Sequence, residues 1–131
     1  MGHASLEFSP LQLAVLTVSD TRDLASDSSG ELLVTALKAA GHQLADRQLV
    51  KDDIYQIRAV LSQWIASPHI QGVIITGGTG FTGRDTTPEA VKPLFDKEVE
   101  GFGELFRQVS YTEIGTSTIQ SRAVAGLANR T

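Results

Sequence analysis

The sequence contains no cysteine, few aromatic residues and no excess of basic charge. The absence of cysteine excludes disulfide bonds, thiolate metal sites and a cysteine nucleophile, and it favours the cytoplasm, a reducing compartment. Lysine and arginine number 11 against 15 aspartate and glutamate residues, for a net charge of −4, so we expect no nucleic acid partner. The apolar runs are short and no basic segment precedes one at the start, so we expect neither a membrane span nor a signal peptide.

The residues that are present have the pattern of one α/β domain. A chain of 131 residues with 41% hydrophobic residues can build a single core. Apolar runs at 11–18 and 71–76 predict strands, a further strand fits near 43–50, and helical periodicity between these segments predicts helices near 32–40 and 54–65. This alternation predicts a three-layer sandwich around a mostly parallel sheet. We expect a flexible segment at 1–10 and a single domain over 11–131, with further helices at 87–100, 102–114 and 118–128.

Polar residues follow each of the three predicted strands. They are Ser19 and Asp20, then Asp52 and Asp53, and then a loop that begins at Thr76. In such folds ligands bind outside the carboxyl ends of the strands, so these segments are candidates for one site. Ordinary structural roles stay open at this point, because Asp20 suits a turn and either Asp52 or Asp53 could cap the next helix.

The loop over residues 76–88 is unusually rich in glycine and threonine. Glycines let backbone N–H groups approach an anion, threonine hydroxyls add donors, and the following helix adds partial positive charge at its start. The pattern favours a phosphate site. Asp85 would repel phosphate by itself, but it fits if Mg²⁺ bridges the carboxylate to phosphate oxygens. A glycine-rich structural connection with capping threonines is the alternative.

Other motif matches are weak. Residues 78–83 fit G-x-G-x-x-G, but they follow the third strand and Pro88 places the helix start too late for a dinucleotide fingerprint. Arg84 and Asp85 stand where a Walker A motif needs Lys and then Ser or Thr. The histidines, His3, His42 and His69, lack the spacing of metal ligands.

The loop, read as TGGTGFTGRDTTPEA from Thr76, resembles the signature of the molybdenum cofactor biosynthesis family, which includes the bacterial MoaB and MogA proteins. The segment LTVSD at 16–20 is similar to the first strand and pocket edge of that family. The segments EVEGFG at 98–103 and IGTSTIQSRAVAG at 114–126 resemble the MoaB branch in particular. The resemblance extends from about residue 11 to residue 131.

This resemblance implies a molybdopterin-binding-domain-like fold and an adenylyltransferase reaction, in which molybdopterin attacks Mg-ATP and releases pyrophosphate. It implies that Asp52 and Asp85 are catalytic and hold Mg²⁺. Substrate and nucleotide contacts are expected from Ser19, Asp20, Thr76, Gly77, Gly78, Thr79, Gly80, Ser121 and Arg122. It also implies a homotrimer or hexamer and contacts with other enzymes of the pathway.

Two expectations accompany this assignment. A non-catalytic molybdopterin-binding protein, or a scaffold oligomer in the same pathway, is the alternative to an enzyme. Family members continue past the position of Thr131 with a further strand and a loop that lines the pocket. We therefore expect that the 11–131 domain lacks its C-terminal part, and that activity is impaired if it does.

Overall fold

Strands and helices alternate through the first half of the chain, as the sequence predicts. The structure, a computed structural model, describes residues 7–131. Its strands are β1 (Gln12–Val18), β2 (Gln43–Val50), β3 (Gly72–Thr76), β4 (Lys97–Glu98) and β5 (Gly126–Leu127). Its helices are α1 (Ser28–Ala39), α2 (Ile54–Ala66), α3 (Thr87–Val91) and α4 (Glu100–Ile114), with 3-10 turns η1 (Lys92–Leu94) and η2 (Gly115–Gln120).

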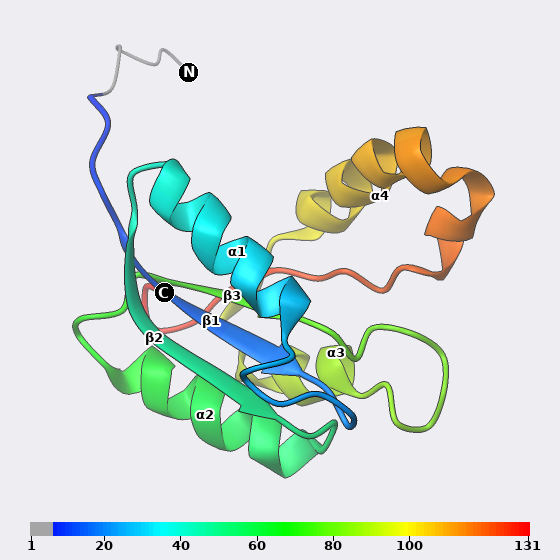
Figure 1. The fold of residues 1–131 in the computed structure, drawn as a ribbon, viewed down its shortest axis with the longest axis horizontal. Helices are drawn as coiled ribbons and strands as arrows, with labels where there is room; N and C mark the ends of the chain where they lie inside the picture. The colour runs from blue at the N-terminus through cyan, green and yellow to red at the C-terminus, as the bar shows by residue number, and fades with distance from the viewer. Residues whose placement is uncertain (1–6) are drawn as a thin grey trace.

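The main sheet is parallel, with β1 in the centre and β2 and β3 on either side (Figure 1). Val18 pairs with Val50 at the end of one ladder, and Thr17 pairs with Thr76 at the end of the other. The three strands therefore end at the same edge of the sheet. The polar segments that follow them are brought to that edge, as the sequence predicts.

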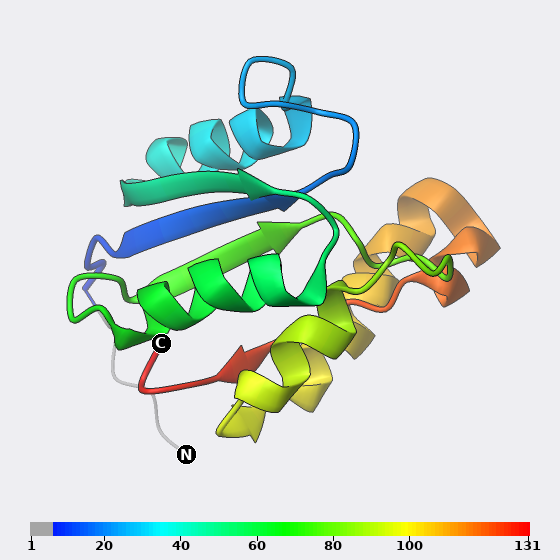
Figure 2. The ribbon, with the colours of Figure 1, turned by 90° about the horizontal axis from the view of Figure 1, so that it is seen from below.

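Helices cover both faces of the sheet, so the predicted three-layer arrangement is confirmed (Figure 2). Alternate residues of β1 point to opposite layers because side chains of a strand alternate between its faces. Ala14, Leu16 and Val18 belong to one apolar cluster, which contains the α2 residues Ile57, Leu61 and Trp64. Leu13 and Val15 belong to the other cluster, which contains the α1 residues Val34 and Leu37.

Local signals in the sequence define the ends of the first two helices. Asp27 caps α1 by accepting a hydrogen bond from the Gly30 N–H, and Gly41, with φ of +92°, follows the helix. Asp53 caps α2, since its Oδ1 accepts from the N–H groups of Tyr55 and Gln56. The choice between Asp52 and Asp53 as the cap is thereby decided in favour of Asp53.

The helix predicted over 87–100 is wrong, because α3 ends at Val91 and the 3-10 turn η1 replaces its continuation. Pro93 has no N–H to donate to the carbonyl four residues earlier, so the α-helical ladder cannot extend through it. The chain then forms β4, which pairs antiparallel with β5.

The helix predicted over 118–128 is also wrong. Gly115, with φ of +65°, caps the end of α4 and begins η2, which ends at Gln120. The chain beyond is extended, and its backbone bonds are made with a distant segment: Val99 N–H donates to the Ala125 carbonyl, and Asp96 N–H to the Leu127 carbonyl. Pairing with β4 therefore overrides the local helical pattern of the 121–128 segment.

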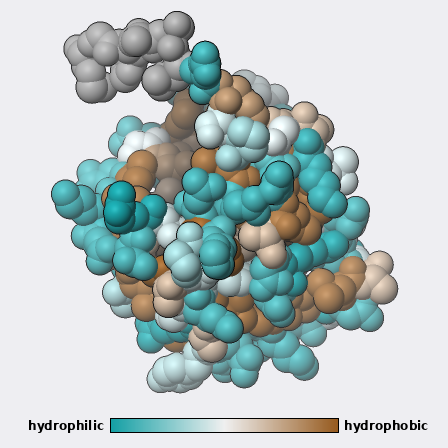
Figure 3. Space-filling model, turned by 90° about the vertical axis from the view of Figure 1, so that its left-hand side faces the viewer, coloured by the Kyte–Doolittle hydropathy of each residue, from teal (hydrophilic) through white to brown (hydrophobic). Residues whose placement is uncertain are grey.

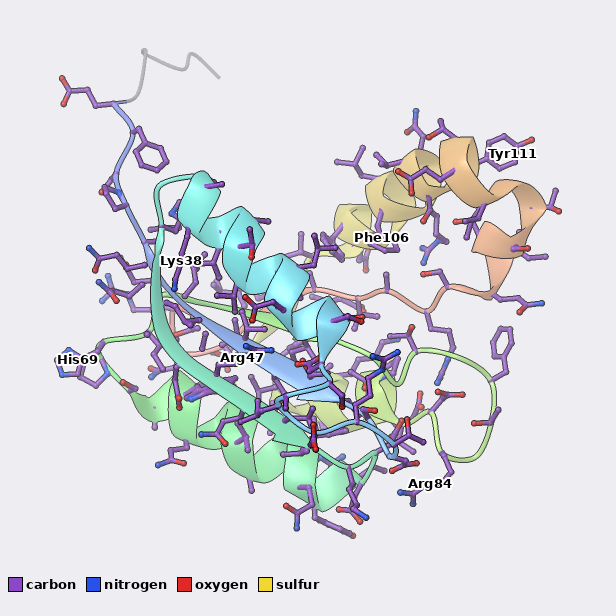
Figure 4. All side chains as sticks on the ribbon, viewed as in Figure 1. Lys38, Arg47, His69, Arg84, Phe106 and Tyr111 are labelled. Carbon is purple, nitrogen blue, oxygen red and sulfur yellow. The ribbon has the colours of Figure 1, made fainter. Side chains whose placement is uncertain are left out.

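The end of the molecule opposite to the polar edge is seen in Figure 3, where hydrophilic residues surround separate apolar patches. His42 and His69 lie at the amino ends of β2 and β3, and Figure 4 shows His69 far from Arg84. His3 and most of the 1–10 segment lie outside the described residues.

Among residues 7–131, no helix has both the length and the apolar character that a membrane crossing requires.

Candidate functional site

Three loops meet at the carboxyl edge of the sheet and are joined by side-chain hydrogen bonds. The Asp52 N–H, after β2, donates to Asp20 Oδ1, after β1, at 3.0 Å. The Thr86 N–H, at the end of the glycine-rich loop, donates to Asp52 Oδ1 at 3.0 Å. Arg84 of the same loop donates to Asp20. The structure thus places Asp20, Asp52 and the glycine-rich loop together, as the sequence predicts.

Asp52 is buried, with 5% of its surface exposed, and it holds the start of α3. Its Oδ1 accepts from both the N–H and the hydroxyl of Thr86. Its Oδ2 receives no hydrogen bond from the described residues. Among these residues, Arg47 Nε is the one side-chain polar atom that is sealed from solvent without a partner, so Asp52 Oδ2 keeps access to solvent. Asp52 therefore has one oxygen engaged by the protein and one available to a ligand.

The glycine turn after β3 lets Asp52 approach this closely. Gly77 and Gly78 have φ of +99° and +70°, a region that residues with a side chain rarely adopt. A Cβ on Gly78 would lie 2.2 Å from Thr87 Oγ1 and 2.7 Å from Asp52 Oδ2. Within residues 7–131, the backbone N–H groups of Gly77, Gly78 and Thr79 donate to no protein acceptor. These N–H groups are therefore free to bind an anion.

Asp85 lies in the same loop and is held by Thr82. Its Oδ2 accepts from the Thr82 hydroxyl at 2.7 Å and from the Thr82 N–H at 3.0 Å. These hydrogen bonds lower the pKa of Asp85 below its ordinary value, in spite of an opposing effect of desolvation. Asp85 is therefore a carboxylate at neutral pH, a form that suits a cation and not a phosphate.

Asp20 and Arg84 form a two-point ion pair that closes the loop over the edge of the sheet. Arg84 Nε donates to Asp20 Oδ2 at 2.9 Å, and Nη2 donates to Oδ1 at 2.8 Å. The hydrogen bond from Arg84 is the largest cause that lowers the pKa of Asp20 to about 2, and Asp20 in turn raises the pKa of Arg84. Sequence motifs predict no role for Arg84, although Arg84 stands next to Asp85 in the glycine-rich loop.

The remaining predicted site residues have varied surroundings. Ser19 Oγ accepts from the N–H groups of Thr21 and Arg22, which shapes the turn after β1. Thr76 is the last residue of β3, and Thr79 and Gly80 continue the loop. Arg122 reaches the loop from the 121–125 segment, but it donates to the protein carbonyls of Gly80 and Asp85. The role of each as a substrate contact stays a prediction.

The two aspartates fit a magnesium ion held jointly with a phosphate ligand. Mg²⁺ prefers oxygen ligands and usually binds one or two carboxylates together with water and substrate phosphates. Thr86 binds only Oδ1 of Asp52, and Thr82 binds only Oδ2 of Asp85, so these hydrogen bonds leave one oxygen of each carboxylate to offer to a cation. Among these residues no three His, Asp or Glu side chains gather closely enough to hold a metal alone.

The fold and the site define an α/β protein with a glycine-rich, carboxylate-lined candidate ligand site. The family model described as a probable molybdopterin binding domain matches residues 14–129. Over 131 residues the chain is 56% identical to "Molybdenum cofactor biosynthesis protein B" of Escherichia coli (strain K12). The aligned region covers 100% of this chain and 77% of that protein. A protein of the same name from Staphylococcus epidermidis is 48% identical, with coverages of 93% and 72%.

Solved structures agree with these sequence matches. A crystal structure of Molybdenum cofactor biosynthesis protein B has a TM-score of 0.88 and 44% identity, covering 92% of this chain and 75% of that one. The structure of tungsten cofactor synthesizing protein MoaB from Pyrococcus furiosus has a TM-score of 0.81 and 38% identity, with coverages of 93% and 76%. The chain therefore belongs to the molybdopterin-binding-domain family of molybdenum cofactor biosynthesis proteins. The expectation of a missing C-terminal part stays a prediction.

The close contact at Gly78 leads to a stability prediction. Gly78→Ala forces a Cβ against Thr87 and Asp52 at a left-handed φ, so we expect it to destabilise the fold by about 2 kcal/mol or more. Gly83→Ala is the matched control in the same loop, because a Cβ there meets nothing within 4 Å. It should change stability by less than about 0.5 kcal/mol. Urea unfolding of both variants tests this, and equal losses would contradict the packing argument.

The Asp20 and Arg84 ion pair predicts acid sensitivity. Because the folded-state pKa of Asp20, about 2, lies below its ordinary value of 3.8, the ionised pair stabilises the fold above pH 4. That contribution is lost as the pH falls toward 2. The midpoint of thermal unfolding should therefore fall less between pH 5 and pH 2 in Asp20→Asn than in the wild-type protein. The pair is partly exposed, so 1 M NaCl should weaken the effect. Glu104→Gln, on the exposed surface of α4, is the control and should show the wild-type dependence of the unfolding midpoint on pH. The same wild-type dependence in Asp20→Asn would refute the role of the ion pair.

Proposed function

We propose that this chain catalyses the Mg-ATP-dependent adenylylation of molybdopterin, a step of molybdenum cofactor biosynthesis. The observation that carries the proposal is the pair of aspartates, Asp52 and Asp85, on either side of a glycine turn with free backbone N–H groups. Membership of the molybdopterin-binding-domain family and the names of its relatives support the choice of pterin and pathway. A nucleotide phosphate and a hard cation are the ligands that this set of donors and acceptors favours.

In the proposed reaction a phosphate oxygen of molybdopterin attacks the α-phosphorus of ATP. A new oxygen to α-phosphorus bond forms, the bond between the α-phosphorus and the bridging oxygen breaks, and pyrophosphate leaves with the electron pair. The substrate supplies the nucleophile, so no protein nucleophile is required. This agrees with a site in which the described residues offer carboxylates, hydroxyls and backbone N–H groups in place of a cysteine or histidine.

The protein's contribution is to bind and orient the reactants. The free oxygens of Asp52 and Asp85 would hold Mg²⁺, which neutralises charge on the phosphates when it is bound. The N–H groups of Gly77, Gly78 and Thr79 would donate to phosphate oxygens. Thr82 keeps Asp85 ionised, and Thr86 keeps the Asp52 carboxylate turned toward the loop. Fixed donors of this kind lower the barrier by positioning the reacting groups.

The catalytic role of the aspartates is tested by amide substitutions. Asp52→Asn and Asp85→Asn preserve shape but remove the charge that would hold Mg²⁺, so each should lower the rate of adenylylation about 100-fold. Asp53→Asn is the matched control, because Asn caps a helix as well as Asp and Asp53 binds only the first turn of α2. The assay incubates purified protein with molybdopterin, ATP and Mg²⁺ and measures adenylylated product and pyrophosphate.

The same assay separates the enzyme from the non-catalytic alternative. If the wild-type protein binds molybdopterin in equilibrium dialysis but forms no product with competent pterin, the adenylyltransferase proposal is wrong and a binding or scaffold role replaces it. If product forms equally in wild-type and both aspartate variants, the proposed roles of Asp52 and Asp85 are wrong.

We also propose that the chain forms a homotrimer or a hexamer. The helix α4 carries exposed apolar side chains, which include Phe102, Leu105, Phe106 and Val109, and Figure 4 shows Phe106 and Tyr111 on this helix at one side of the molecule. An apolar face of this kind is typical of a contact between subunits. The contact would support either an enzyme or a scaffold.

The oligomer is tested by light scattering. Leu105→Glu combined with Val109→Glu introduces charge into the α4 face, so we expect the mass to fall to that of a smaller species. Leu32→Glu is the control, because Leu32 is 69% exposed on α1, and it should leave the mass unchanged. A wild-type mass equal to one chain would contradict the oligomer, and a trimer or hexamer that survives the double substitution would exclude this face as the contact.

A further inference from the structure

The side chain of Arg122 lies across the glycine-rich loop and joins its two arms. Its Nε donates to the carbonyls of Gly80 and Thr79, at 2.8 and 3.3 Å, on the arm before the tip. Its Nη2 donates to the Asp85 carbonyl at 2.7 Å, on the arm after the tip. The third nitrogen, Nη1, donates to the Glu89 carboxylate of α3 at 2.6 Å. Each nitrogen of the guanidinium therefore has a protein acceptor.

The tip of the loop adds a further contact to Arg122. The Arg122 guanidinium carbon lies 5.9 Å from the centre of the Phe81 ring, a distance at which a cation attracts an aromatic face. Phe81 is 70% exposed, and the described residues give it no apolar packing from the core clusters. Arg122 therefore contacts the tip of the loop as well as both of its arms.

Arg122 can order the loop because its own segment is anchored. Arg107 of α4 donates from Nη1 to the Ser121 carbonyl at 3.1 Å, and the Thr118 hydroxyl donates to the Arg107 carbonyl at 3.2 Å. At the other end of the segment, the Val99 N–H donates to the Ala125 carbonyl. The guanidinium thus links the loop to a backbone that is held on both sides.

We propose that Arg122 is a positioning residue that holds the glycine-rich loop in its ligand-binding form before the ligand arrives. It fixes the backbone of Asp85, and so the carboxylate that Thr82 orients, and it fixes the arm that carries the free N–H groups of the turn. The effect on catalysis rests on the adenylyltransferase proposal, whereas the effect on loop order does not. Pre-ordering reduces the entropy that binding would otherwise lose.

This role differs from the direct substrate contact expected for Arg122, and the two roles predict different variants. A direct contact that acts by positive charge would be largely kept in Arg122→Lys. A guanidinium that bridges separate carbonyls cannot be replaced by the single ammonium group of lysine. Arg122→Lys should therefore resemble Arg122→Ala if Arg122 positions the loop.

Hydrogen exchange of the ligand-free protein tests the effect on the loop. In Arg122→Ala and Arg122→Lys we expect the amides of Thr82 and Asp85, which are bonded within the tip, to exchange roughly 10-fold faster, with β1 amides unchanged. Arg58→Ala is the matched control, because Arg58 also donates to two carbonyls, those of Ala90 and Glu89, but outside the loop. Unchanged exchange in both Arg122 variants would overturn the proposal.

Kinetics then test the link to catalysis. If the wild-type protein forms adenylylated product, both Arg122 variants should raise the KM for Mg-ATP and lower kcat, with kcat/KM reduced roughly 10-fold to 100-fold, while Arg58→Ala stays near wild type. Wild-type activity in Arg122→Lys together with normal loop exchange would refute positioning. If the wild-type protein forms no product but the loop amides exchange faster in the Arg122 variants, the proposed function is overturned and the loop-ordering role of Arg122 is supported.

Discussion

The parallel pairing of β1 with both of its neighbours is the constraint on which the site depends. It makes β1, β2 and β3 end at the same edge of the sheet, so loops separated by more than thirty positions in the sequence meet there. The apolar residues of β1 drive this pairing because they are buried on both faces. The candidate site residues lie in the loops after the strands, and the strands bring Asp20, Asp52 and the glycine-rich loop within hydrogen-bond distance.

A buried carboxylate at this edge requires donors close to it, and the loop provides them. Asp52 is stable in its position because two groups of Thr86 donate to one of its oxygens. Gly78 makes the approach possible, since any side chain there would occupy the space of Asp52 and Thr87. The same glycine turn leaves N–H groups unpaired within the described chain. Structural support and ligand binding therefore draw on the same few residues.

Two arginines stabilise the loop from different directions. Arg84 belongs to the loop and pairs with Asp20 at the sheet edge, where the pair is partly exposed and screened by salt. Arg122 comes from a segment nearly forty residues later and binds mostly backbone carbonyls, which carry no sequence signal. The first contact joins two predicted site segments. The family resemblance implied that Arg122 contacts the substrate, but its bonds to the loop carbonyls require the extended path of the 121–125 segment, where the local pattern predicted a helix.

The sequence by itself determined the three strands of the main sheet, the helices α1, α2 and α4, and the edge at which polar residues gather, because apolar periodicity and capping residues act over short distances. Only the tertiary structure decided that Asp53 caps α2 while Asp52 turns to Thr86, and that Pro93 is followed by a strand instead of more helix. It also decided that residues after Gln120 run extended to pair with β4. The reason is physical: backbone groups and carboxylates take whichever partner the fold brings closest, and that partner can lie far away in the sequence.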